Sequence, residues 1–302
     1  MKYGFLSDVN GVDFKLRESS SFNNDFIKAN KKSDLEIHIG CSVWADKDYV
    51  GKFYPDKTPQ KNYLKEYAKQ FSTVEVNATR YGTPSPKTLN TWKEAVGNDF
   101  KLSFKVPQII SQRKDLLSKD VLGRLDQYVL AIDTMGLKAG TSFMLLQNNF
   151  SLSRLPELEK FIKYLPNEQE YAFEIRNPEL NQTQELGALL NQYNIAHVVT
   201  DTAGRRDVVH QMTTNNTAYI RFVGNGLIET DYKRIDAWIL RLGEWIDQGL
   251  NKIYFMIHQP DQLRSFSAIL AKYTIETLNI KYPNLGLKTP IDYTNKGQTK
   301  MF

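Results

Sequence analysis

The chain has 302 residues, a formal net charge of +5, and a composition of 41% hydrophobic and 24% charged residues, as in ordinary globular proteins. This length can bury a sizeable core, and the modest positive charge permits an anionic ligand without requiring one. Cys41 is the sole cysteine, which excludes an intrachain disulfide, and no segment is apolar enough for a signal peptide or a membrane span. We therefore expect a soluble, cytoplasmic protein with no membrane partner.

Short β-rich runs alternate with helical patterns between two polar ends of the chain. Residues 1–34 are predicted to form an irregular N-terminal extension, residues 35–282 a single domain, and residues 283–302 a C-terminal tail. Repeated βα units predict a parallel sheet, and eight of them predict a closed (β/α)8 TIM barrel. The eight predicted strands are 35–40, 73–77, 100–105, 141–147, 171–176, 195–201, 218–223 and 252–258.

Helical patterns follow most of these strands. Ser85 followed by Pro86 is a helix start signal, because serine caps the first turn and proline suits its first position. The clearest helix follows Thr230, where apolar residues recur at helical spacing until Gly249, which is suited to cap its end. The sixth connection, 204–216, has no such stripe and is predicted to be a long loop with a short helix.

Nearly every predicted strand has a polar side chain at its C-terminal end. Glu75 and Asn77 are two residues apart and share a strand face, as do Glu174 and Arg176. In TIM barrels the active site lies at the C-terminal mouth, so these strand ends predict a site there. A purely structural network of ion pairs is the alternative, but several converging charges carry a desolvation cost that structure alone rarely needs.

The residue types at the mouth favour acid–base chemistry on an anion. The candidate catalytic residues are Glu75, Lys105, Glu174 and Asp201, because carboxylates serve as general acids or bases and a lysine among cations can act as a base or a Schiff-base nucleophile. Arginines clamp carboxylates and phosphates with paired hydrogen bonds. The candidate substrate-binding residues are Trp44, Asn77, Tyr81, Gln147, Arg176, Arg205, Arg221 and His258.

No cofactor is predicted. A divalent metal held by Glu75, Glu174, Asp201 and His258 is the less favoured alternative, because the chain has only four histidines and no clustered histidine motif. The sequence also lacks a P-loop, a dinucleotide-binding fingerprint and a nucleophile elbow.

Nine segments of the chain resemble the YecE-like family, also called domain of unknown function 72. They are IHIGCSVW (37–44), GKFYP (51–55), FSTVEVNATRY (71–81), FKVP (104–107), LQ (146–147), FEIRN (173–177), DT (201–202), YIRF (219–222) and IHQP (257–260). The resemblance implies a TIM barrel, in agreement with the strand count, and no established activity.

The resemblance also separates matching positions from departures. It is best at Trp44, Glu75, Asn77, Tyr81, Lys105, Gln147, Glu174, Arg176, Asp201 and Arg221. The sequence departs from the family pattern at Tyr49, Arg80, Gln112, Asn177 and His258 followed by Gln259. These departures indicate a subgroup whose ligand differs in detail.

Three functions remain open at this point. The favoured hypothesis is an enzyme that isomerises, cleaves or hydrolyses a small phosphorylated or carboxylated substrate. Nucleic-acid binding or phosphodiester processing is an alternative, suggested by the positive charge and by aromatic residues such as Trp44 and Tyr81 near the mouth. A non-catalytic ligand-binding protein is the other alternative. The sequence does not predict the oligomeric state.

Overall fold

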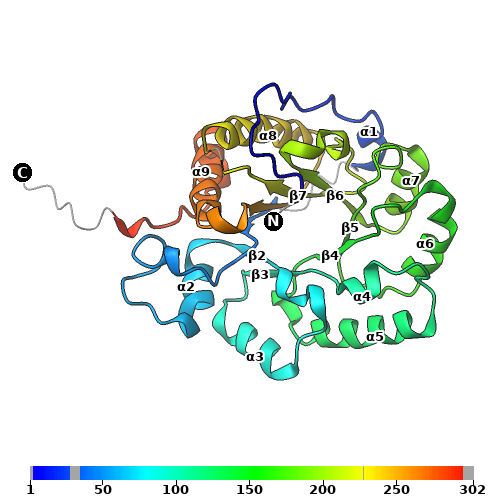
Figure 1. Ribbon diagram of the computed structural model, residues 1–302, viewed down its shortest axis with the longest axis horizontal. Coiled ribbons are helices and arrows are strands. Elements are labelled where there is room, and N and C mark those ends of the chain that lie inside the picture. The colour runs from blue at the N-terminus through cyan, green and yellow to red at the C-terminus, as the bar shows by residue number, and fades with distance from the viewer. Residues whose placement is uncertain (1–2, 28–34, 227, 295–302) are drawn as a thin grey trace, which may run out of the picture.

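The computed structural model describes residues 3–27, 35–226 and 228–294. Its eight parallel strands form a barrel-like sheet with helices outside it (Figure 1), which confirms the predicted (β/α)8 architecture. The sheet order is β3-β2-β1-β8-β7-β6-β5-β4. The strands are β1 Glu36–Cys41, β2 Thr73–Val76, β3 Lys101–Phe104, β4 Ser142–Leu145, β5 Tyr171–Glu174, β6 Ala196–Asp201, β7 Thr217–Val223 and β8 Lys252–His258.

The seam between β3 and β4 nearly closes the barrel. Lys105 and Phe143 form an isolated parallel bridge there, and the Val106 N–H donates to the Phe143 carbonyl at 2.9 Å. A second bridge joins Leu102 to Ala139. The seam therefore places Lys105, at the end of β3, against β4.

Helices follow most strands and cover the outside of the sheet. Ser85 caps α3 as predicted, with its Oγ accepting from the Thr88 N–H at 3.2 Å. The predicted sixth connection is confirmed as a loop with a short 3-10 helix, Ala203–Val208. The α-helices are α1 Asn23–Phe26, α2 Tyr63–Gln70, α3 Pro86–Ala95, α4 Gln108–Ser111, α5 Lys119–Asp133, α6 Leu155–Ile162, α7 Gln184–Gln192, α8 Ile228–Gln248 and α9 Phe266–Lys281.

Both faces of the sheet are buried. A small cluster that includes Phe143, Val198, Tyr219, Tyr254 and Met256 fills the barrel, and a larger apolar cluster lies between the strands and the helices. Six of the seven residues in β7 and in β8 are buried. Because both faces of these strands are covered, their sequences are largely apolar and do not alternate with polar residues. The polar residues at the strand ends lie above this filled interior.

Several predicted strands are longer than the observed ones at the mouth. The predicted strand 73–77 ends at Val76, and Asn77 begins a 3-10 helix, Asn77–Tyr81. Lys105, Gln147 and Arg176 likewise come after the last residue of their strands. Side chains at these four positions border the cavity at the barrel mouth, which makes them available to a ligand.

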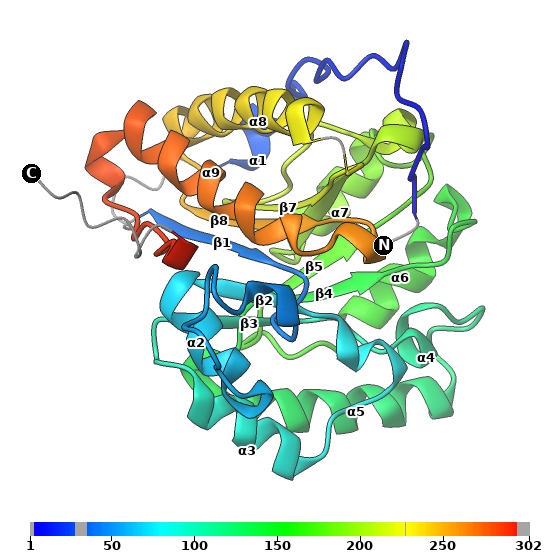
Figure 2. The same ribbon diagram turned by 60° about the vertical axis from the view of Figure 1, so that its left-hand side comes forward.

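The described part of the N-terminal extension, residues 3–27, lies against the barrel. It passes α8 and descends beside the strand ends, as the dark blue trace in Figure 2 shows. The described part of the C-terminal tail is also attached, since the Tyr293 N–H donates to the Lys52 carbonyl at 2.7 Å. Residues 1–2 and 28–34 of the predicted extension and residues 295–302 of the predicted tail lie outside the described residues. No helix within the described ranges is long and apolar enough to cross a bilayer.

Candidate active site

A buried arginine joins two carboxylates under the barrel mouth. Arg221 on β7 donates from Nε and Nη2 to the two oxygens of Glu75, each at 2.8 Å, and from Nη1 to Glu174 Oε2 at 2.7 Å. All three side chains are essentially inaccessible to solvent. Removing Arg221 would leave the buried Glu75 carboxylate without a guanidinium partner, so the arginine is the group that joins the three. We call Glu75, Glu174 and Arg221 the ion-pair triad.

The triad holds both carboxylates ionised. Burial alone raises the pKa of Glu75, but the charge and hydrogen bonds of Arg221 outweigh it and hold the pKa well below its usual value. For Glu174 the opposing effect of burial is overcome by Arg176 and Arg221, and its pKa falls to about 2. Neither carboxylate borders the cavity above them. Their carboxylates are therefore placed to orient neighbouring groups.

Glu75 orients two groups that do border the cavity. Its Oε1 accepts from Asn77 Nδ2 at 2.8 Å and lies 3.1 Å from His258 Nε2. His258 Nε2 also lies 3.4 Å from Arg221 Nη2, a group that can only donate. The shorter contact with the ionised Glu75 carboxylate, which only accepts, favours the ring proton of neutral His258 on Nε2 and leaves Nδ1 as an acceptor. Burial lowers the pKa of His258 more than Glu75 raises it, which favours the neutral ring.

Lys105 is the buried cation of the cavity floor. Lys105 is 5% exposed, and its Nζ lies 5.2 Å from the centre of the Phe143 ring. Burial, followed by repulsion from Arg221, lowers the pKa of Lys105 to about 8. Across residues 3–27, 35–226 and 228–294, no hydrogen bond or ion pair engages its Nζ, although the side chain borders the cavity. An amine buried in this way is available to a ligand.

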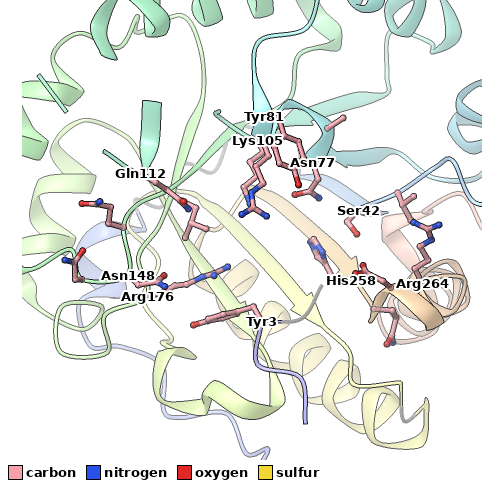
Figure 3. Close-up of a pocket in the computed structure, with 18 residues that line it drawn as sticks. Tyr3, Ser42, Asn77, Tyr81, Lys105, Gln112, Asn148, Arg176, His258 and Arg264 are labelled. Atoms are coloured by element: carbon pink, nitrogen blue, oxygen red, sulfur yellow. The ribbon is translucent and has the colours of Figure 1, made fainter. Parts of the chain in front are cut away.

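The cavity above these residues has a volume of about 990 Å³. Figure 3 shows Lys105, Asn77 and His258 directed into the same space, with Arg176 and Tyr3 across from them. Four cations and, within the described ranges, one acid, Asp261, border it. An excess of cations around a concave site favours a negatively charged ligand. The cations are Arg80, Lys105, Arg176 and Arg264.

Amide side chains supply most of the other polar groups. Asn77 and Gln147 belong to the predicted site, and Gln147 Oε1 also accepts from Arg154 Nη1 at 3.0 Å. Tyr81 lies at the rim, 78% exposed. The remaining amide groups that border the cavity are those of Gln112, Asn148, Asn149 and Gln259.

The structure does not bring Asp201 to this site. Inward residues of β6 include Ala196 and Val198, so Asp201 faces outward, toward α8. Its carboxylate accepts from Arg234 Nη2 at 2.8 Å and from Trp238 Nε1 at 2.6 Å, and it also pairs with Arg206. The prediction that Asp201 faces the mouth is therefore corrected, because its alternation with the inward residues places it on the opposite face.

Three predicted binding residues also lie outside the cavity lining, namely Arg221, which is buried in the ion-pair triad, Trp44 and Arg205. Trp44 packs edge-on against Trp92, with ring centres 5.7 Å apart, and contributes to packing beside α3. Arg205 is paired with Asp207, Nε to Oδ1 at 2.8 Å, and its Nη2 donates to the Arg176 carbonyl at 3.4 Å. Trp44 and Arg205 both lie near the mouth without bordering the cavity.

Tyr3, Arg80 and Arg264 are among the residues of the cavity wall that sequence reasoning missed. Arg80 and Arg264 lie in the connections after β2 and β8, where position after a strand end is a signal that could have found them. Tyr3 belongs to the N-terminal extension, and nothing in the sequence around it indicates a mouth residue. No group of three or more His, Cys, Asp or Glu side chains in the part of the chain that the structure describes is arranged to hold a metal ion.

Comparisons with known proteins identify the family. A model of the family described as "Protein of unknown function DUF72" matches residues 38–294. The chain belongs to this DUF72 family. It is 28% identical over 247 residues to the UPF0759 protein YecE of Escherichia coli K12, covering 74% of this chain and 87% of that protein.

Solved DUF72 structures share the fold. A DUF72 family protein of Thermotoga maritima MSB8 matches with a TM-score of 0.64 at 20% identity, over 80% of this chain and 99% of that one. A DUF72 family protein of Enterococcus faecalis V583 matches with a TM-score of 0.62 at 15% identity, over 85% of this chain and 100% of that one. At identities of 15% and 20%, these two structures show a shared fold and nothing about activity.

Proposed function

We propose that the protein is an enzyme that moves protons on a small phosphorylated or carboxylated substrate bound at the barrel mouth. The observation that carries this proposal is Lys105, a buried amine that borders a cation-rich cavity and has no hydrogen-bond or ion-pair partner among the described residues. A buried charge without a partner is costly, and ligand binding is a common reason to retain one.

The four cations that border the cavity are suited to different contacts with an anion. Arg176 presents a planar guanidinium suited to bidentate contact with a carboxylate or phosphate, whereas the Lys105 ammonium acts as a point charge. Arg80 and Arg264 add positive charge at the outer wall. Asn77 and Gln147 offer amide donors and acceptors that suit hydroxyl groups of the same substrate.

Lys105 and His258 are the proposed proton-transfer groups. With a pKa of about 8, about nine tenths of the Lys105 amines are charged at pH 7, and the ammonium that holds the anion donates a proton to the substrate. His258 Nδ1 is the proton acceptor, since its Nε2–H is engaged by Glu75. One neutral imidazole and one ammonium support isomerisation, in which His258 takes a proton from one substrate atom and Lys105 gives a proton to another. They also support elimination, in which His258 takes the proton and Lys105 protonates the departing group.

In this proposal the ion-pair triad keeps the predicted site residues Glu75 and Glu174 in a supporting role. Their low pKa values keep them ionised at neutral pH, so they do not donate protons there. Glu75 sets the tautomer of His258, and Glu174 fixes Arg176 through Nε at 2.7 Å. Arg221 pairs with both carboxylates and lowers the pKa of Lys105.

Titration with anions tests the proposal. We expect inorganic phosphate or small phosphorylated and carboxylated metabolites to raise the melting temperature, because a ligand that binds only the folded state stabilises it. Lys105→Met should weaken that binding roughly 10- to 100-fold, the range for losing a charged hydrogen bond. Lys101→Met is the matched control, since Lys101 is the first residue of β3, which Lys105 follows, and its Nζ donates to the Leu137 carbonyl at 2.7 Å, away from the cavity. Absence of stabilisation by every anion at millimolar concentration would remove the proposal.

The rim favours one second candidate function, nucleic-acid binding. Tyr81 is 78% exposed, and Arg80 Cζ lies 5.7 Å from the centre of its ring. An exposed aromatic ring beside a cation is suited to stacking on a nucleobase. A gel shift with a short single-stranded oligonucleotide at low salt checks this function, and it should be lost in Tyr81→Ala. No shift by the wild-type protein at low salt excludes it.

A further inference from the structure

The N-terminal segment is attached to the barrel along its length. We call residues 3–27 the N-terminal strap. At its far end, the Thr213 N–H donates to Asn23 Oδ1 at 2.9 Å, and Trp245 Nε1 donates to Ser19 Oγ at 2.8 Å. Asn23 is fully buried. These contacts fix the strap to α8 and to the connection after β6, so the strap has a defined path toward the mouth.

The mouth end of the strap is fixed by its backbone. The Gly204 N–H donates to the Gly4 carbonyl at 2.7 Å, and Thr202 Oγ1 donates to the Tyr3 carbonyl at 3.1 Å. Leu6 N–H donates to Asn225 Oδ1 at 3.0 Å. Gly4 has φ +67°, and a Cβ there would meet Thr202 Oγ1 at 2.2 Å, so the close approach requires glycine. The backbone of Tyr3 is therefore set beside the cavity.

The ring of Tyr3 covers one face of Arg176. The guanidinium carbon of Arg176 lies 3.6 Å from the centre of the Tyr3 ring, and Figure 3 shows the two side chains next to each other. Arg176 Nε donates to Glu174 Oε1 at 2.7 Å. The Arg176 side chain is 10% exposed. No described residue accepts a hydrogen bond from its Nη1 or Nη2. The Tyr3 ring and the Glu174 carboxylate thus fix the plane of the Arg176 guanidinium, and its Nη1 and Nη2 remain available to a ligand.

We propose that Tyr3 is a positioning residue for the anion site, holding the Arg176 guanidinium so that a carboxylate or phosphate binds along its free edge. This inference rests on the proposed function. With one face covered by Tyr3 and Nε engaged by Glu174, the two Nη groups are left for the anion, which is the geometry of bidentate recognition. The family model matches residues 38–294, so Tyr3 comes from outside the part of the chain that it covers. The strap therefore adds a feature of this chain to the shared barrel.

Substitutions that separate the ring from its hydroxyl group test the inference with inorganic phosphate as the probe. Tyr3→Phe keeps the stacked ring, and we expect its Kd for phosphate to stay within about twofold of wild type. Tyr3→Leu removes the ring, and we expect the Kd to rise about 3- to 30-fold, the range for losing a cation–π contact. Phe5→Leu, on the same strap, is the matched control because Phe5 is 45% exposed and does not border the cavity.

The loss of phosphate affinity in Tyr3→Leu should also depend on the presence of Arg176. In an Arg176→Met background, Tyr3→Leu should cause no further loss of phosphate affinity, because the residue that it positions is already gone. Equal losses in both backgrounds, or an unchanged Kd in Tyr3→Leu, would overturn the inference. If Lys105→Met loses phosphate while Tyr3→Leu does not, the proposed function stands and the inference fails.

A ligand-independent readout covers the case in which phosphate does not bind. Phenylglyoxal modifies accessible arginines, and mass spectrometry of the digested protein reports the rate at Arg176. We expect modification in Tyr3→Leu to be several-fold faster than in wild type or Tyr3→Phe. Equal rates in the three proteins would show that the ring does not hold Arg176, whatever the fate of the proposed function.

Discussion

Replacing Lys105 with methionine is expected to stabilise the protein at neutral pH while weakening anion binding. Lys105 is 5% exposed, and burial together with Arg221 lowers its pKa from 10.5 to about 8. The unfolded chain therefore binds this proton more tightly than the folded protein does. The charged amine opposes folding, and a methionine of similar length removes that penalty.

The magnitude follows from the two pKa values. At about 1.4 kcal/mol per pH unit, a fall from 10.5 to about 8 corresponds to roughly 3 kcal/mol of destabilisation at pH 7. As the pH rises from 8 toward 10.5, the unfolded state loses its extra proton and the stability of wild type increases relative to the variant. The difference between the two proteins should shrink by roughly 2 kcal/mol between pH 7 and pH 9.5.

Urea unfolding of both proteins at pH 7 and pH 9.5 measures this difference, and taking the difference cancels the other titrating groups. We expect Lys105→Met to have the larger free energy of unfolding at pH 7, and we expect its advantage over wild type to be smaller at pH 9.5. A variant that is less stable than wild type at pH 7, or a difference that does not change with pH, would refute the reasoning. Methionine is expected to fill the same space beside Phe143, so a packing defect should remain below about 1.5 kcal/mol.

Three other substitutions test separate parts of the structure. Arg221→Met leaves two buried carboxylates without their shared cation and should cost about 3–5 kcal/mol in urea unfolding; a loss below about 1 kcal/mol would contradict the ion-pair triad. Asp201→Asn should destabilise by about 2 kcal/mol while phosphate affinity stays within about twofold of wild type, since Asp201 faces α8; lost affinity would return it to the site. Burial lowers the pKa of His210 from 6.5 to about 4, so its contribution to stability is present above pH 6.5 and is lost as the pH falls toward 4. Wild type should lose about 2 kcal/mol more than His210→Gln between pH 7 and pH 4.5, and equal losses would contradict the buried neutral ring.

The sequence predicts the barrel because the eight βα units repeat a local pattern. It also predicts the meeting of Glu75, Glu174 and Arg221, because the C-terminal ends of parallel strands lie at one edge of the sheet. Their pairing into one buried triad, which leaves Lys105 as the available group, depends on side-chain geometry across the barrel. Strand alternation alone cannot rank carboxylates and amines by their pKa values.

Two failures of prediction have identifiable physical causes. All six residues of β6 are buried, so hydrophobic alternation cannot tell which face of this strand is inward, and Asp201 was placed on the wrong one. Tyr3 reaches the mouth through long-range contacts of the strap, such as Gly4 with Gly204, which have no local periodic signal. A glycine with a close neighbour in space is indistinguishable in sequence from a flexible one.

The protonation of Lys105 tests the central claim most directly. In protein with isotopically labelled lysine side chains, NMR titration follows the Lys105 signal, assigned by its loss in Lys105→Met, with and without saturating inorganic phosphate. We predict a pKa near 8 in the free protein and a clear rise when phosphate is bound, because an anion beside the amine favours its charged form. A pKa near 10.5 that phosphate does not change would contradict an anion site built on this buried amine.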